Sequence, residues 1–170
     1  MSKVAPFYRM HVCENDSQQV LGPDSLWDLD CGDRFAWPAS ESAKPGEIKG
    51  RMCGWLPGNS WSPFVSQEIK GRLEPLVGEC VQWHGPFEIH GQTYFFLNCV
   101  NVLDCALPGS DSNLTFIDAK AVGESWIFRP KGFVRDLICS EAFRDNCVYS
   151  GDTGVRFGRI KDDGWEDFPF

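Results

Sequence analysis

The sequence GQTYFFLNCVNVLDC, residues 91–105, is the most strand-like stretch of the chain and decides its fold. Alternate residues of a β-strand point to opposite faces of the sheet, and both faces of this stretch are mainly apolar. A strand of that kind normally lies in the middle of a sheet, covered on both sides. We therefore expect a central strand, with Cys99 filling the core and Asn101 and Asp104 at its end. The two faces hold Tyr94, Phe96, Asn98, Val100 and Val102, and Phe95, Leu97, Cys99, Asn101 and Leu103.

The residues just before this stretch predict its partner strand. Between Cys80 and His90, apolar and polar residues alternate on either side of Gly85-Pro86. We expect a bulge or bend at this dipeptide, because proline cannot donate a hydrogen bond to the sheet. The short turn sequence His90-Gly91-Gln92 then predicts a β-hairpin that leads into the central strand.

A short helix is predicted just upstream of this hairpin. Ser66 is a favourable N-cap residue, and Ile69 and Leu73 are spaced to share one face of a helix. Pro75 should end the regular helix near Glu74, because proline disfavours helical backbone in the residue before it.

A second block, residues 137–157, repeats the order of N-cap, short helix, turn and strand. Ser140 is the cap, Phe143 faces the core, and a last strand begins at Val155. The identity between the blocks is weak, so we interpret them as a recurring αβ unit. Together these patterns predict an α+β fold over residues 1–170: one compact domain with a mostly antiparallel sheet and a few short helices. Residues 1–62 form an acidic, loop-rich N-terminal part.

The charge of the chain bears on its partners. The formal net charge is −8 at pH 7, and nucleic acids are bound chiefly by clustered Lys and Arg, so we expect no nucleic-acid partner. Residues 10–33 contain six acidic residues and no Lys or Arg, and the C-terminal tail is acidic too. If exposed, these segments would attract a basic partner and speed its docking; acidic loops that only keep the protein in solution are the alternative.

The N-terminal sequence and the cysteines indicate a compartment. Residues 1–12 hold no apolar core long enough for a signal peptide, and no window approaches the roughly 18 apolar residues of a membrane span. We expect a cytoplasmic protein with no membrane partner. The eight cysteines are at least six positions apart, and in a reducing compartment they are expected to be free thiols that pack as small hydrophobic groups.

The search for chemistry predicts neither catalysis nor a cofactor. Of the three histidines, His84 could pair with Cys99 as base and nucleophile, but no local signature supports this. Ligand types suitable for zinc occur without the close spacing of zinc sites. We therefore predict no catalytic residues, no metal and no cofactor, and a binding protein rather than an enzyme. The possible zinc ligands are His84, His90, Cys99, Asp104 and Cys105.

Four stretches between residues 63 and 160 resemble a family of bacterial immunity proteins, the Imm11 (DUF1629) type. They are a Ser-initiated helix followed by Gly and a strand, an aromatic strand that closes on Asn and Asp, an Ile-Phe-Arg sequence, and a second Ser-initiated block that ends in Gly and Phe. The resemblance implies that the protein binds and neutralises a cognate bacterial toxin in the producing cell. The stretches are Ser66 to Leu73, Tyr94 to Asp104, Ile127 to Arg129 and Ser140 to Phe157.

The expected binding surface consists of acidic and aromatic loops. Tryptophan side chains frequently anchor interfaces, and a basic toxin domain would be steered by acidic loops. A small enzyme or a metal-binding module that acts on the toxin's product or target is the alternative. The predicted partner-binding residues are Trp27, Asp28, Asp30, Asp33, Trp55, Trp61, Asp162, Asp163 and Trp165.

Overall fold

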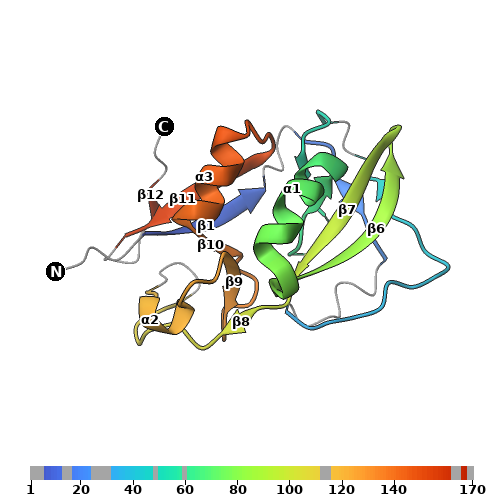
Figure 1. The fold of residues 1–170 in the computed structure, drawn as a ribbon. Helices are drawn as coiled ribbons and strands as arrows, with labels where there is room; N and C mark the ends of the chain where they lie inside the picture. The colour runs from blue at the N-terminus through green and yellow to red at the C-terminus, as the bar shows by residue number, and fades with distance from the viewer. Residues whose placement is uncertain are drawn as a thin grey trace.

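The computed structural model describes residues 6–12, 17–23, 32–47, 50–58, 61–111 and 116–161, and the backbone of 166–167. It consists of two main sheets with short helices (Figure 1). All strand pairs are antiparallel except the parallel pair β8–β9. The predicted α+β class, with mostly antiparallel sheets in one compact domain, is therefore confirmed.

The four-stranded sheet has the order β4-β5-β7-β6, and the six-stranded sheet the order β12-β11-β1-β10-β9-β8; β2 and β3 form a separate pair. The strands are β1 (Phe7–Val12), β2 (Val20–Leu21), β3 (Lys44–Pro45), β4 (Trp55–Leu56), β5 (Phe64–Ser66), β6 (Val81–Ile89), β7 (Gln92–Cys99), β8 (Val102–Leu103), β9 (Ile127–Pro130), β10 (Ile138–Ser140), β11 (Val155–Ile160) and β12 (Glu166–Asp167). The helices are α1 (Gln67–Val77), the 3-10 turn η2 (Gly78–Cys80), α2 (Ala119–Val122) and α3 (Glu141–Tyr149).

The central strand predicted from residues 91–105 is β7. It lies between β5 and β6, and buried side chains such as Phe96 and Leu97 cover its two faces. His90 and Gly91 form the turn of the β6–β7 hairpin, and both have positive φ. The pairing register shifts between His84 and Phe87, which confirms the bend expected at Gly85-Pro86.

The second part of the same stretch joins a different sheet, which the alternating pattern did not predict. β7 ends at Cys99, and the chain crosses into the other sheet, where Val102 pairs with Arg129 of β9. Backbone hydrogen bonds change partner at this point: the Val100 amide donates to the Cys80 carbonyl, and the Arg129 amide donates to the Asn101 carbonyl. Because apolar alternation continues across the crossing, periodicity alone could not locate it.

Helix α1 begins as predicted and ends later than predicted. The Ser66 hydroxyl accepts from the Ile69 amide at 3.4 Å, which satisfies one of the free donors of the first turn. The predicted end near Glu74 is wrong, since the helix contains Pro75 and continues to Val77. Pro75 has no amide to donate to the Gly71 carbonyl, and burial of Val77 offsets the loss of that hydrogen bond.

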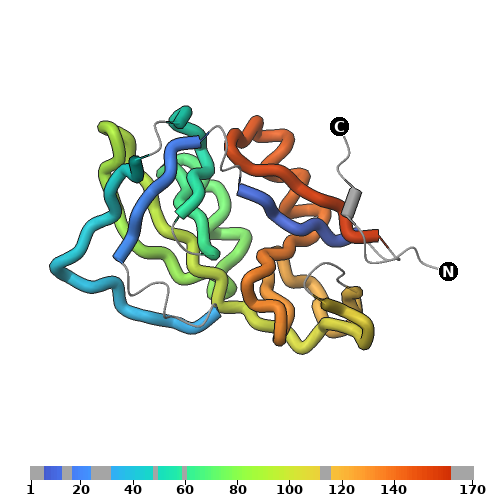
Figure 2. The backbone as a smooth tube through the Cα atoms, turned by 180° about the vertical axis from the view of Figure 1, so that it is seen from behind, coloured from blue at the N-terminus to red at the C-terminus, as the bar shows by residue number. Residues whose placement is uncertain are grey.

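Helix α3 is built in the same way. The Ser140 hydroxyl accepts from the Phe143 amide at 3.3 Å, and Phe143 and Cys147 are buried. The recurring unit is thus a strand, a serine-capped helix and a second strand. In each unit a third strand lies between the two strands that flank the helix: β7 between β5 and β6, and β1 between β10 and β11. In Figure 2, β1 (blue) runs beside β11 (red) although the two lie at opposite ends of the chain.

The two units share one hydrophobic core. Ile69 and Leu73 of α1 belong to the same buried cluster as Phe143 and Cys147 of α3. Asp152, in the loop after α3, adds a polar link. Its carboxylate accepts from Arg72 of α1 at 2.7 and 2.5 Å and from the Trp55 indole N–H at 3.1 Å.

Candidate functional site

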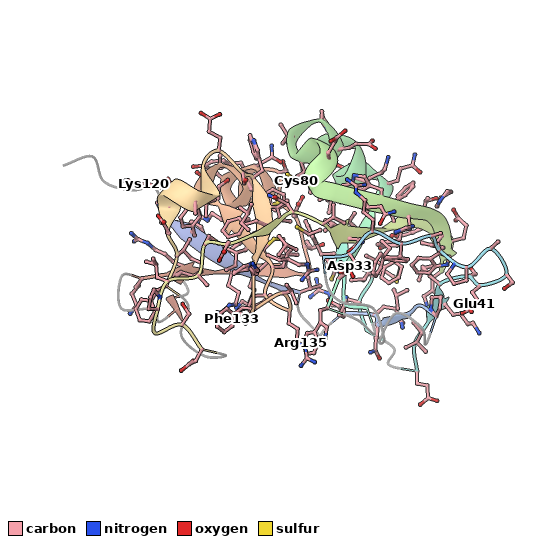
Figure 3. The ribbon with its side chains drawn as sticks, turned by 90° about the horizontal axis from the view of Figure 1, so that it is seen from below. Asp33, Glu41, Cys80, Lys120, Phe133 and Arg135 are labelled. Carbon is pink, nitrogen blue, oxygen red and sulfur yellow. The ribbon has the colours of Figure 1, made fainter. Side chains whose placement is uncertain are left out.

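A cleft of about 440 Å³ opens where three segments distant in the sequence come together. One wall is the second half of β1, another consists of residues 57–58 and 61–63 before β5, and the third is the segment 135–137 that leads into β10. The cleft thus lies between the two main sheets, at the point where both units contribute to its walls. Figure 3 shows Arg135 near the middle of the molecule, where the two halves meet.

Strand β1 supplies charged side chains to the cleft because its residues alternate. Tyr8 and Met10 belong to the core, and Arg9 and His11 alternate with them along the strand. The Met10 amide donates to the Leu137 carbonyl at 2.8 Å, which brings the neighbouring Asp136 next to β1. The Arg9 guanidinium donates to the Asp136 carboxylate at 3.2 Å.

Trp61 and Arg135 lie at the cleft and contact each other. The Arg135 guanidinium lies 4.9 Å from the centre of the Trp61 ring, a cation–π distance. Trp61 is 50% exposed, so much of this pair remains open to a partner. Both residue types are enriched among those that dominate binding energy at protein interfaces.

The wall that carries Trp61 is held by a buried arginine. Arg129 of β9 is fully buried. Its guanidinium donates to the Trp61 carbonyl at 3.2 Å, to the Ser62 hydroxyl at 2.9 Å and to the Val134 carbonyl at 2.7 Å. It also donates to the Cys99 carbonyl at 3.2 Å. Arg129 therefore ties the end of β7 to two walls of the cleft.

The structure places two of the predicted binding residues on the surface. Trp61 lies at the cleft, as described. Asp33 is exposed, and its carbonyl accepts from the Asn98 side chain at 2.8 Å; Asp33 is not among the residues that line the cleft. The remaining acidic and aromatic positions lie outside the described residues: Trp27, Asp28, Asp30, Asp162, Asp163 and Trp165.

The prediction that Trp55 is an exposed anchor is wrong. Trp55 has no exposed surface, and its indole N–H donates to Asp152. Trp55 follows Gly54 in a segment rich in glycine and proline, and this composition predicted a surface loop. The segment instead forms β4, which pairs with β5 and places the Trp55 ring in the shared core.

Sequence reasoning missed Arg9, Arg129 and Arg135. Two of them had a local signal, since each of Arg9 and Arg129 is a lone cation within an apolar strand sequence, FYRMHV and IFRP. Such a residue needs hydrogen-bond partners once the strand is buried. Nothing local marks Arg135, because its position at the cleft depends on the pairing of β1 with β10.

Four buried cysteines and His84 are arranged as parts of the scaffold. Burial raises the pKa of the Cys99 and Cys105 thiols to about 11 and also raises that of Cys139 and Cys147, so the reactive thiolate is disfavoured. His84 lies on the face of the β6–β7 sheet opposite Cys99, since it pairs with Phe96 and Val81 pairs with Cys99. The suggested base–nucleophile pair is therefore not assembled.

His84 lies in an aromatic cluster instead. Its ring stacks on Phe35 with 4.3 Å between the centroids and lies near Trp37 and Phe96. Loss of hydration in this environment lowers the pKa of His84. Within the described residues, no group of three or more His, Cys, Asp or Glu side chains could hold a metal ion.

Over the part of the chain that the structure describes, no helix has the length and apolar character needed to cross a membrane. Comparison with models of protein families and with curated proteins finds no match for the chain. The fold and the cleft define an α+β protein with an open cleft whose lining includes Arg9 and Arg135, and the resemblance to toxin immunity proteins stays a prediction.

Proposed function

We propose that this protein is an immunity protein that binds a cognate bacterial toxin domain in the cytoplasm and neutralises it by one-to-one association. The observation that carries the proposal is the Trp61–Arg135 pair at the mouth of the cleft. An interface anchor needs a rigid, partly apolar side chain that is open to the partner before binding. Trp61 meets this requirement, because half of its surface is exposed and Arg129 fixes the backbone that carries it.

Charge supports the same proposal over a longer range. The chain carries a formal net charge of −8, and such a field speeds the encounter with a basic toxin domain. Asp33 is an exposed part of this field. We propose that Asp28 and Asp30 act with it, so that the acidic segment steers the toxin and the Trp61–Arg135 pair anchors it.

The high pKa of two buried thiols argues against their use as nucleophiles. A cysteine nucleophile requires an accessible thiolate, whereas Cys99 and Cys105 are buried thiols with pKa values of about 11. The proposal assigns neutralisation to association alone.

The test first looks for a toxin domain encoded beside the gene for this chain, and the absence of one would count against the proposal. Wild-type protein is expected to form a one-to-one complex with it and to abolish its toxicity at equal molar amounts. Trp61→Ala should weaken binding by about 30-fold or more, the range of an interface hot spot. Tyr149→Ala is the matched control, because Tyr149 is 84% exposed on α3 and does not line the cleft. Protection at substoichiometric amounts, or equal binding by both variants, would contradict the proposal.

A further inference from the structure

The interior of the cleft has the size and lining of a small-molecule site. Its volume of about 440 Å³ lies in the range of roughly 300–1,000 Å³ that is typical of ligand pockets. Such pockets are mainly apolar, with a few polar groups that converge on the ligand. The apolar residues in its lining are Met10, Val12, Pro57, Trp61, Pro63 and Leu137.

The charges around the cleft favour an anion. Among the described residues that line it, Arg9 and Asp136 offset each other in an ion pair, and Arg135 is a further, exposed cation. Arg129 adds a cation directly behind the wall. Its four hydrogen-bond acceptors are three backbone carbonyls and one hydroxyl, so these contacts do not neutralise its charge. A partly enclosed pocket with such walls concentrates anions even on a protein whose net charge is negative.

Two donors are arranged to meet that anion. The Ser62 hydroxyl, which lines the cleft, already accepts from Arg129 at 2.9 Å, so its own O–H is left to donate to another group. The Arg135 guanidinium carbon lies 4.9 Å from the centre of the Trp61 ring, and a guanidinium has several N–H donors that can meet a carboxylate or a phosphate. Trp61 also offers exposed ring surface on which a planar group can pack.

We propose that the cleft binds a small organic anion, whose carboxylate or phosphate contacts Arg135 and Ser62 and whose planar, apolar part packs against Trp61. The ligand would contact the same Trp61–Arg135 pair that the proposed function assigns to the toxin, so the two would compete, but the inference does not depend on the proposed function. The carboxylate and the phosphate share the chemistry that Arg135 recognises, and the experiment below separates them.

The test is calorimetric titration of the purified full chain with four probes at concentrations up to about 1 mM, a range suited to weak ligands. Benzoate tests a carboxylate and adenosine monophosphate tests a phosphate, each joined to a planar ring. Adenosine is the neutral control, and inorganic phosphate is the anion without a ring. We expect benzoate or adenosine monophosphate to bind. Adenosine and inorganic phosphate should bind at least tenfold more weakly, because adenosine lacks the anionic group and inorganic phosphate lacks the planar ring.

Two matched variants locate the binding. Arg135→Gln should weaken binding of the successful probe by roughly tenfold, the effect of one lost charge-assisted contact. Lys120→Gln should leave it unchanged, since Lys120 is an exposed cation on α2 that does not line the cleft, as Figure 3 shows. Both substitutions are on exposed side chains, and equal thermal unfolding of the variants checks that they fold.

Several results would overturn the proposal. These are the absence of binding by both benzoate and adenosine monophosphate, binding of adenosine as tight as that of its monophosphate, and equal binding by wild type and Arg135→Gln. If no probe binds but Arg135→Gln loses affinity for the toxin domain, the occupant of the cleft is a macromolecule. The proposed function would then stand and this inference would fall.

Discussion

The two strand–helix–strand units follow the same plan but obtain their middle strand differently. In the unit of α1, the middle strand β7 follows β6 directly, across the turn at His90 and Gly91. In the unit of α3, the middle strand β1 comes from the opposite end of the chain and is inserted between β10 and β11. The first unit is therefore made by local contacts, and the second requires closure of a long loop, which costs more chain entropy.

The difference also explains where the cleft lies. Its walls come from β1, from the segment before β5 and from the segment before β10, so it exists only when the remote middle strand is in place. Arg9 and Asp136 form an ion pair between two of these walls. The local unit provides the scaffold, whereas the non-local unit brings the charged side chains of the cleft together.

The largest expected effect tests whether the two helices contribute equally to the shared core. Ile69 and Phe143 occupy the same position after their serine caps and are both buried. Phe143→Ala should lower the free energy of unfolding by about 4 kcal/mol and Ile69→Ala by about 3 kcal/mol, because each leaves a cavity. Urea unfolding measures both losses, with exposed Tyr149→Ala as the control. A loss below about 1 kcal/mol for either residue would show that its helix does not depend on the shared core.

The next effect tests the polar link between the units. The Asp152 side chain is 3% exposed and pairs with Arg72, and it also accepts from Trp55. Asp152→Ala should cost about 3 kcal/mol of unfolding free energy, since it leaves a partly buried guanidinium and a buried indole N–H without their acceptor.

A surface ion pair on the same helix gives the matched control for this substitution. Glu74 pairs with Lys70 at 2.7 Å on the exposed side of α1, and Glu74→Ala should cost less than about 1 kcal/mol. Urea unfolding of both variants measures the difference. Similar losses for Asp152→Ala and Glu74→Ala would mean that the units are joined by apolar packing alone.

A smaller effect tests the equivalence of the two caps. Ser66→Ala and Ser140→Ala each remove a hydroxyl that accepts from the third helical amide, so each should cost about 1 kcal/mol. Ser150 is exposed at the end of α3, and Ser150→Ala should change the unfolding free energy little. Unequal losses, measured by thermal unfolding, would show that one helix is fixed by its packing and not by its cap.

The local unit could be predicted from the sequence to a large extent. The serine cap, the hairpin turn and the alternation around Phe96 all act within a few residues, and the structure confirms each of them. The end of α1 at Val77 could not be predicted, because burial outweighed the local preference of Pro75. The crossing after Cys99 could not be predicted either, since it depends on β9, which is remote in the sequence.

The cleft could be predicted only in part. Trp61 was predicted as a surface residue and is exposed, whereas Trp55 has a similar sequence context and is buried. The difference is that Trp55 enters a strand that pairs with β5. Arg135 and Arg9 meet at the cleft only because β1 pairs with β10, a pairing that no periodicity in either segment indicates.

The smallest expected effect is the pH dependence that His84 gives to the local unit. Burial lowers the pKa of His84 below its usual value of 6.5, so the folded state binds a proton less readily than the unfolded state. The contribution of neutral, buried His84 to the free energy of unfolding is complete above about pH 7. It is lost as the pH falls below 6.5 toward the folded-state pKa of His84. His84→Phe keeps a ring against Phe35 and should flatten the fall in unfolding free energy between about pH 7 and about pH 5. His90→Asn, at the exposed turn, should leave that slope unchanged; an unchanged slope in His84→Phe would mean that other groups cause the pH dependence.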